Sequence, residues 1–207
     1  MSDAPRITRH GSHSWFVRAD PHQRGPLIAQ LTAMPEVVDV TAGADDLLVH
    51  LTTGISVDHA SLLLQAATDR ATTDQTSQST ELIELPVTYD GPDLEYVALE
   101  TGLSVEQVIE RHSQTLFTAS FCGFSPGFAY LTGLPEQLQL PRRTDPRAAV
   151  PAGSLAIAAE YSAIYPSASP GGWHLIGTCQ VPLFDLERTP PATIRPGMRV
   201  RFTRVEP

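Results

Sequence analysis

Residues 123–127 read GFSPG, which fits the G-x-S-x-G pattern of the sharp turn that carries the nucleophilic serine in many hydrolases. In such a turn the residue after the serine supplies a backbone N–H to the oxyanion hole, and Pro126 has none. The turn must also lead into a helix, whereas GFAYLTGLP is interrupted by Gly and Pro. We interpret the match as accidental. Ser125 then either binds a ligand or forms a hydrogen bond within a turn.

His112 is the second residue whose type suits catalysis. It follows Val108 by four positions and Ile109 by three in an expected helix, so it shares their apolar face. An imidazole can act as a general acid or base because its ordinary pKa is near neutral pH. The alternative is a core histidine that donates to a carbonyl, and the residues alone favour it. His112 and Ser125 are nevertheless the two catalytic candidates in the chain.

An arginine-rich segment, LPRRTDPRAAVPAGS (140–154), predicts an anion site in an otherwise acidic protein. Guanidinium groups bind carboxylate or phosphate in a bidentate manner, and the flanking prolines make the loop stiff. The alternatives are a solvated surface or ion pairs with Asp145. We favour ligand binding, by Arg142 and Arg147 rather than by Arg143.

Two glycine turns, VPAGS (150–154) and YPSASPGGW (165–173), add hydroxyl groups and an indole. Glycine allows a ligand to approach the backbone closely, and it is equally common at the corners of β-barrels. We expect Ser154 and Ser169 to contribute to substrate binding. Trp173 would form the floor of a pocket or belong to the core.

Composition excludes several classes of function. The 207 residues carry 14 basic and 23 acidic side chains, a formal charge of 14 − 23 = −9, which argues against a generally basic nucleic-acid-binding surface. The chain has no apolar run of about 18 residues, so no membrane span is predicted. Without a signal peptide at the N-terminus, we expect a cytoplasmic protein. Its histidines and cysteines show no zinc-binding spacing, so no metal is predicted.

The first part of the chain predicts a small α+β domain. Strands are expected at 12–19, 36–43 and 45–52, and helices at 25–34 and 57–70. With a strand at 81–87 the order becomes β-α-β-β-α-β, the ferredoxin-like unit. A polar linker at 71–80 separates domains 1–80 and 81–207. The sequence does not decide whether the strand at 81–87 closes the first domain or opens the second.

The second part predicts a helical hairpin followed by a β-rich domain. Gly102 suits the end of a helix at 92–102, and Ser104 with Gln107 forms a capping box for a helix at 104–114. Short apolar segments separated by Gly and Pro follow, which is typical of a compact β-barrel or sandwich. These segments lie at 116–121, 154–160, 174–179 and 198–205.

Several motifs in order resemble a known family across about residues 86–204. They are GPDL, GLSVEQVIERHS, GFSPGFAYLTGLP, PRRTDPRAAVPAGSLAIA, IYPSASPGGWHLIG, VPLFD and PGMRVRF. Together they are similar to the B subunit of 5-oxoprolinase, also known as allophanate hydrolase subunit 1 or as the Kip inhibitor of a sporulation histidine kinase. The resemblance implies a cyclophilin-like β-barrel as the C-terminal domain and a small α+β unit before it.

The resemblance also implies partners and a reaction. The C subunit of 5-oxoprolinase, or allophanate hydrolase subunit 2, and the A subunit would join this chain in the ATP-dependent opening of 5-oxoproline to glutamate. ATP would serve the complex, with no cofactor held tightly by this chain. Arg142 and Arg147 would then clamp an anionic substrate, His112 would act as acid or base, and Ser125 and Ser154 would donate hydrogen bonds. The alternative function is a non-catalytic protein that binds and inhibits a sensor histidine kinase.

Overall fold

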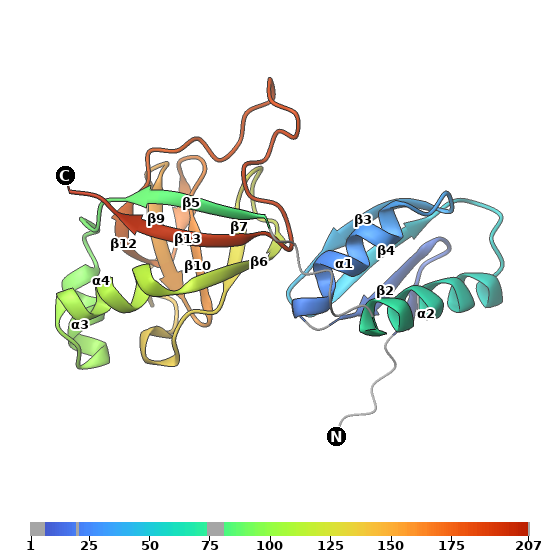
Figure 1. Ribbon diagram of the computed structural model, residues 1–207, viewed down its shortest axis with the longest axis horizontal. Helices are drawn as coiled ribbons and strands as arrows, with labels where there is room; N and C mark the ends of the chain where they lie inside the picture. Colours follow the sequence, from blue (N-terminus) through green and yellow to red (C-terminus); the bar gives the residue numbers. More distant parts are fainter. Residues whose placement is uncertain (1–6, 20, 74–80, 207) are drawn as a thin grey trace. The chain divides into compact units, whose positions relative to one another are not determined.

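The computed structural model describes residues 7–19, 21–73 and 81–206 (Figure 1). The chain divides into two compact units, Met1–Thr80 and Glu81–Pro207. Within the described residues no helix is long and apolar enough to cross a membrane. Each unit has its own hydrophobic core.

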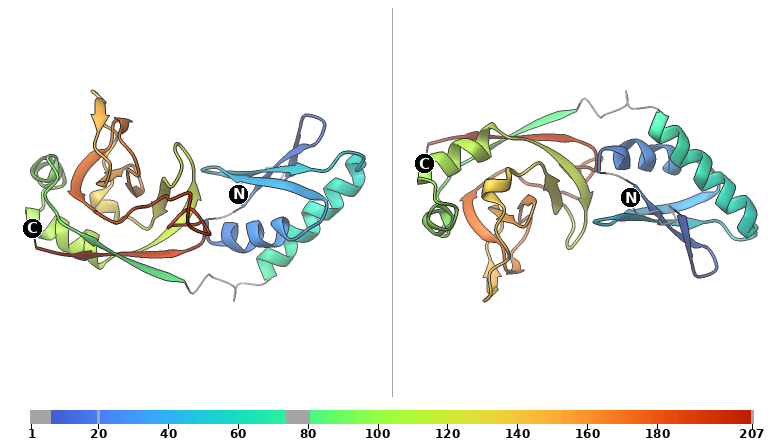
Figure 2. Two further views of the ribbon diagram at one scale, coloured as in Figure 1. Left: turned by 90° about the horizontal axis from the view of Figure 1, so that it is seen from above. Right: turned by 90° about the horizontal axis from the view of Figure 1, so that it is seen from below.

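The first unit is a four-stranded antiparallel sheet covered by two helices on one face (Figure 2). Its elements are β1 (Ile7–His10), β2 (Ser14–Arg18), α1 (Pro21–Thr32), β3 (Val37–Ala42), β4 (Asp46–Leu51) and α2 (Val57–Thr73). The strands lie in the order β1-β2-β4-β3. Trp15 and Val17 alternate with more exposed neighbours along β2 and are buried, as their spacing predicts.

The ferredoxin-like prediction for this unit is not confirmed. The strand expected to complete it, β5 (Leu82–Val87), belongs to the sheet of the second unit. There Leu85 and Val87 point into the second unit's core. The edge beside β2 is instead occupied by β1, a strand that the periodicity did not predict.

The second unit is built on a seven-stranded curled sheet, in the order β12-β9-β10-β7-β6-β13-β5 (Figures 1 and 2). Besides β5, its elements are α3 (Leu94–Thr101), α4 (Val105–Gln114), β6 (Leu116–Cys122), β7 (Ala129–Thr132), η1 (Glu136–Leu138), β8 (Arg147–Val150), β9 (Ser154–Ala158), β10 (Tyr161–Ile164), β11 (Ser169–Gly171), β12 (His174–Thr178) and β13 (Arg199–Arg204). Strands β8 and β11 form a separate two-stranded ribbon. Only β5 and β13 run parallel among the described pairs; the others are antiparallel.

The two edges of the curled sheet meet at one end. Thr88 follows β5 and Thr178 ends β12, and each donates its backbone N–H to the other's carbonyl, at 2.9 and 2.7 Å. This bridge needs close backbone approach, because a Cβ at the neighbouring Gly177 would lie 2.5 Å from the carbonyl oxygen of Thr88. The bridge also fixes the start of the segment that leads from β5 to α3.

Helices α3 and α4 form the expected hairpin. Gly102 ends α3 in the left-handed conformation, with φ 68°, and the capping box of Ser104 and Gln107 is present at the start of α4. Val108, Ile109 and His112 form the buried face of α4. They pack on the core of the curled sheet, where the ring of His112 lies beside Phe117 of β6 and Phe202 of β13.

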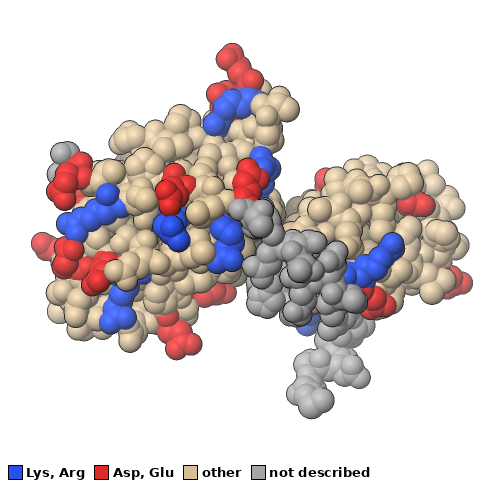
Figure 3. Space-filling view, in the orientation of Figure 1, with Lys and Arg blue, Asp and Glu red and all other residues tan. Residues whose placement is uncertain are grey.

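Charged side chains on the face of the second unit seen in Figure 3 alternate in sign. Arg195 pairs with Glu81 at 2.6 Å, and Arg201 pairs with Glu84 at 3.2 Å. A broad basic patch is therefore absent from this described face, and the arginines that remain for ligand binding must be sought elsewhere in the unit.

Candidate functional site

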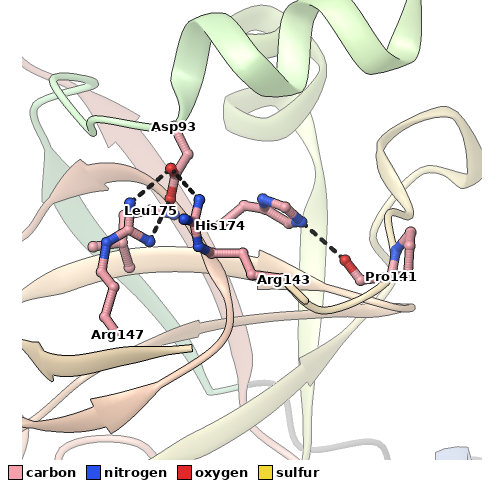
Figure 4. Close-up of polar contacts among 6 residues, drawn as sticks. All are labelled: Asp93, Pro141, Arg143, Arg147, His174 and Leu175. Carbon is pink, nitrogen blue, oxygen red and sulfur yellow. Dashed lines mark hydrogen bonds and ion pairs between the residues drawn. The ribbon is translucent and has the colours of Figure 1, made fainter. Parts of the chain in front are cut away.

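A buried carboxylate, Asp93, joins three segments of the second unit (Figure 4). Arg147 donates from Nη2 to Oδ1 at 2.7 Å and from Nη1 to Oδ2 at 2.9 Å, in a bidentate pair. Arg143 donates to Oδ1 at 2.9 Å, and the backbone N–H of Leu175 donates to Oδ2 at 2.7 Å. We call these four residues the Asp93 cluster.

The position of Asp93 explains why its side chain is free for this role. It directly precedes α3, where an aspartate commonly caps the helix, yet its side chain makes no capping hydrogen bond. Its backbone N–H donates to the carbonyl of Leu175 at 2.9 Å, which anchors the start of α3 to β12. The carboxylate therefore faces the arginine loop, and α3, β12 and that loop are held together at one point.

The arginines keep Asp93 ionised. Burial alone would raise the pKa of this carboxyl, but the hydrogen bonds from Arg147 and Leu175, with the charges of Arg147 and Arg143, outweigh it. The net result is a pKa below the usual range of aspartate. One carboxylate is thus shared by two guanidinium groups, and the cluster keeps a positive excess.

Arg142 is oriented differently from its neighbour Arg143. Its guanidinium carbon lies 6.0 Å from the ring centre of Trp173, within the range of a cation–π contact. No acidic partner for Arg142 is found in the described part of the chain. Burial raises the pKa values of Tyr130 and Tyr165, and the charge of Arg142 acts against the rise at both hydroxyls.

An aromatic group forms the base beneath Arg142. The rings of Phe128 and Tyr130 lie 5.7 Å from Trp173, and the ring of Tyr165 lies 5.3 Å from Phe128. The hydroxyl of Tyr165 accepts a hydrogen bond from the backbone of Trp173, and Gly171 is required beside it because a Cβ would collide with this hydroxyl. We call Arg142, Trp173, Tyr130, Tyr165 and Phe128 the aromatic–arginine site.

The aromatic–arginine site combines a guanidinium with phenol hydroxyls over an apolar base. This combination suits a small carboxylate that carries an apolar body, because the guanidinium binds the charge while the rings accept the hydrocarbon part. Among the described residues no group of three His, Cys, Asp or Glu side chains could hold a metal ion. The side chains of the aromatic–arginine site can recognise an anion and stabilise its charge.

His112 lies in the core of the second unit and is fully buried. Its Nε2 lies 2.9 Å from Oγ of Ser162, and its Nδ1 lies 2.9 Å from the hydroxyl of Tyr89. Ser162 donates to the carbonyl of Ala156 at 3.4 Å, so its oxygen accepts from Nε2–H, and Nδ1 accepts from Tyr89. The imidazole is therefore a neutral link in a chain of hydrogen bonds.

Burial lowers the pKa of His112 to about 3. Its ring is packed against Phe117 and Phe202, each with ring centres 5.0 Å away. None of its hydrogen-bond partners belongs to the Asp93 cluster or to the aromatic–arginine site. The structure thus places His112 in the core, where it donates to the hydroxyl of Ser162 and not to a carbonyl.

Comparison with known proteins places this geometry in a family. The family described as "Carboxyltransferase domain, subdomain C and D" matches residues 6–194. The chain belongs to this family. The resemblance to the B subunit of 5-oxoprolinase is also confirmed: the protein of that name from Escherichia coli O157:H7 is 43% identical over 183 residues, which cover 85% of this chain and 82% of the relative.

Two other carboxyltransferase-domain relatives carry the same name. The 5-oxoprolinase B subunit of Haemophilus influenzae is 38% identical over 84% of this chain and 82% of its own length. The protein of that name from Bacillus subtilis is 41% identical over 60% of this chain and 53% of its own length.

Several solved structures superpose on most of the chain. TTHA0988 has a TM-score of 0.79 at 34% identity and is matched over 94% of this chain, which spans only 40% of that longer protein. PH0987 from Pyrococcus horikoshii has a TM-score of 0.59 at 32% identity, over 97% of both chains. Urea amidolyase of K. lactis shares the fold alone, with a TM-score of 0.69 at 16% identity over 96% of this chain and 15% of that one.

Ser125 lies in a turn between β6 and β7, and no helix follows it. The backbone N–H of Phe128 donates to the carbonyl of Ser125 at 3.0 Å, with Pro126 second and Gly127 third in the turn. Gly127 has φ 83°, as a type II turn requires at that position. The Oγ of Ser125 is buried and has no hydrogen-bond partner. The GFSPG segment thus forms a turn that leads into β7 and not into a helix.

The other predicted serines lie at separate positions in the second unit. Ser154 begins β9, and its Oγ donates to the carbonyl of Pro151 at 2.8 Å, so it closes its own turn. Ser169 begins β11 opposite Val150, and its Oγ is buried without a partner. The structure brings Arg142 and Trp173 together, whereas Arg147 is bound to the Asp93 cluster.

Sequence reasoning missed five residues of the two clusters: Asp93, Leu175, Phe128, Tyr130 and Tyr165. Asp93 lies in the GPDL motif, but its side-chain partners are 50, 54 and 82 residues further along the chain. Tyr130 and Tyr165 lie inside motifs that carried the family resemblance, and their aromatic rings read equally well as core. The sequence offered one signal: Tyr130 lies in a motif that shortly precedes the arginine-rich segment 140–154.

Proposed function

We propose that this chain is the B subunit of a 5-oxoprolinase, a hydrolase complex that opens the lactam of 5-oxoproline to glutamate with consumption of ATP. The observation that carries the proposal is the 43% identity to a relative of that name over 85% of the chain. The C and A subunits of the complex are the proposed partners. ATP is proposed for the complex and not for a tight site on this chain.

The reaction explains what the aromatic–arginine site would do. Hydrolysis adds one water across the amide C–N bond of a five-membered ring, and an unstrained amide needs activation, which ATP supplies as it is converted to ADP and phosphate. Substrate, product and any phosphorylated intermediate are anions. Arg142, over the indole of Trp173, is the proposed clamp for the substrate carboxylate.

The remaining candidates take supporting parts in this proposal. Arg147 and Arg143 hold the loop through Asp93, so Arg147 acts on the substrate through its field rather than by direct contact. The full burial of His112 supports a framework role instead of proton transfer. Ser125 and Ser169, with buried and unpartnered hydroxyls, remain proposed donors to the substrate. We also propose that the curled sheet, with its bridged edges, is a cyclophilin-like barrel.

Reconstitution tests the proposal. The chain is purified with the A and C subunits, and ADP and glutamate are measured from 5-oxoproline and ATP, with and without this chain. We expect both products only when all three proteins are present, in a ratio of one to one. Unchanged turnover on omission would reject the proposal. Capture of a histidine kinase by this chain, without binding of the C subunit, would favour the inhibitor alternative instead.

A further inference from the structure

Phe124 adopts a backbone conformation that side chains with a Cβ rarely take. Its φ is +68°, and Ala159 is the only other residue besides glycine with a positive φ among the described residues. The backbone N–H of Ser125 donates to the carbonyl of Gly123 at 2.8 Å, which closes a three-residue γ-turn centred on Phe124. Such a turn is strained, and strained residues concentrate where structure serves binding or catalysis.

The side chain of Phe124 is also unusually exposed for an aromatic residue, at 61%. Its ring centre lies 5.3 Å from that of Phe128 and 6.4 Å from that of Tyr165, in edge-to-face arrangements. Both partners belong to the aromatic–arginine site, and the hydroxyl of Tyr165 lies in the field of Arg142. Phe124 therefore stands at the rim of this site with most of its side chain exposed.

The surrounding turn holds Phe124 in place. The N–H of Gly123 donates to the carbonyl of Phe128 at 3.1 Å, which closes the loop at its base. A Cβ at Gly127 would lie 2.7 Å from Cβ of Phe184, so the turn is packed tightly against the loop between β12 and β13. The loop thus keeps a strained backbone and an exposed ring at the same residue, although burial of that ring would be favourable.

We propose that Phe124 forms the apolar wall of the aromatic–arginine site and contacts the ring methylenes of the substrate. This inference rests on the proposed function. Arg142 binds the carboxylate, and the exposed face of Phe124 covers the hydrocarbon side of the five-membered lactam. The arrangement selects a carboxylate attached to a compact apolar ring over open-chain amides, because an open chain with a polar end leaves the aromatic wall without an apolar partner.

The test uses the assembled complex and compares three variants of one residue. Phe124→Ala removes the ring, and Phe124→Asn removes it with a side chain that adopts positive φ more often. Phe124→Tyr keeps the ring. We expect both ring-less variants to raise KM for 5-oxoproline about tenfold with kcat within about threefold, and Phe124→Tyr to remain within about threefold of wild type. Phe124→Asn should melt no lower than the unsubstituted chain, which separates loss of binding from loss of folding.

Other outcomes would overturn either the Phe124 contact or the proposed function, and they can be told apart. If Phe124→Ala leaves KM unchanged while Arg142→Ala raises it, Phe124 is no substrate contact, and the proposed function stands. If Phe124→Ala and Phe124→Asn both abolish co-elution with the C subunit, the ring contacts a partner protein and the inference is wrong. If omission of the whole chain leaves turnover unchanged, the proposed function fails first, and this inference fails with it.

Discussion

Both terminal nitrogens of Arg147 donate to the carboxylate of Asp93, at 2.7 and 2.9 Å, although the two residues are 54 positions apart in the sequence. The same carboxylate accepts from Arg143 and from the backbone of Leu175. Since Arg142 is adjacent to Arg143, this cluster also fixes where the free guanidinium of the loop lies. The position of the aromatic–arginine site therefore depends on a buried ion pair elsewhere in the same loop.

Removal of the Asp93 carboxylate should destabilise the second unit. Asp93→Ala leaves two guanidinium groups and the Leu175 N–H without an acceptor, and we expect a loss of about 2–4 kcal/mol in the free energy of unfolding. Asp93→Asn keeps one oxygen that can accept from the Leu175 N–H, so its free energy of unfolding should fall by less than that of Asp93→Ala. Because Trp173 is the only tryptophan besides Trp15, urea unfolding followed by fluorescence in a Trp15→Phe background reports on this unit.

The matched control for Asp93 is an exposed pair of the same type. Arg201 and Glu84 have side chains 42% and 53% exposed, so Glu84→Ala should change the free energy of unfolding by less than about 1 kcal/mol. Equal losses for Asp93→Ala and Glu84→Ala would contradict a stabilising role of the Asp93 cluster.

Burial of neutral His112 predicts a dependence of stability on pH. Its pKa is about 3 in the fold and about 6.5 when unfolded, so between these values the unfolded chain binds a proton that the folded chain does not. The contribution of His112 is fully present above pH 6.5 and is lost as the pH falls towards 3. Below pH 6, we expect His112 to lower the free energy of unfolding by up to about 1.4 kcal/mol for each pH unit.

His112→Gln separates this effect from the other titrating groups. Glutamine can donate to Ser162 but does not titrate, so the variant should be less stable at pH 7.5 and less sensitive to pH between 6 and 4. Urea unfolding at several pH values measures both slopes. If the free energy of unfolding has the same slope against pH for His112→Gln and for the unsubstituted chain, then His112 becomes protonated without unfolding.

Gly127 and Gly102 provide a test of the turn that carries Phe124. Both have positive φ, 83° and 68°, but a Cβ at Gly102 meets nothing within 4 Å, whereas one at Gly127 lies 2.7 Å from Phe184. Gly102→Ala should cost about 1 kcal/mol from backbone conformation alone. Gly127→Ala adds a collision and should cost at least about 1 kcal/mol more. If urea unfolding gives similar losses in free energy for Gly102→Ala and Gly127→Ala, the turn at Gly127 can shift to accept a Cβ at little cost.

Local signals predicted the local structure well. The helical hairpin was predicted from Gly102 and from the box of Ser104 and Gln107, and all three act as expected. These signals work because each concerns backbone groups within one turn of helix. The β segments after residue 116 were recognised for a similar reason, since Gly and Pro interrupt short apolar runs.

Long-range pairing could not be predicted from the same signals. Strand β5 pairs in parallel with β13, where Glu84 and Arg201 are 117 residues apart, so no local pattern shows which sheet it joins. Asp93 reads as an ordinary residue before a helix until its partners are known. Adjacent Arg142 and Arg143 point to different partners, Trp173 and Asp93, and arginine type alone does not distinguish them.

We propose that Arg142 binds the carboxylate of the substrate in a 5-oxoprolinase complex. The most direct test is the KM for 5-oxoproline of the three-protein complex with Arg142→Ala, with Arg201→Ala as the control at an exposed ion pair. Loss of a charge-assisted hydrogen bond predicts a KM raised about 10- to 100-fold for Arg142→Ala and within about twofold of wild type for Arg201→Ala. Equal KM values for Arg142→Ala and the unsubstituted complex would contradict the account.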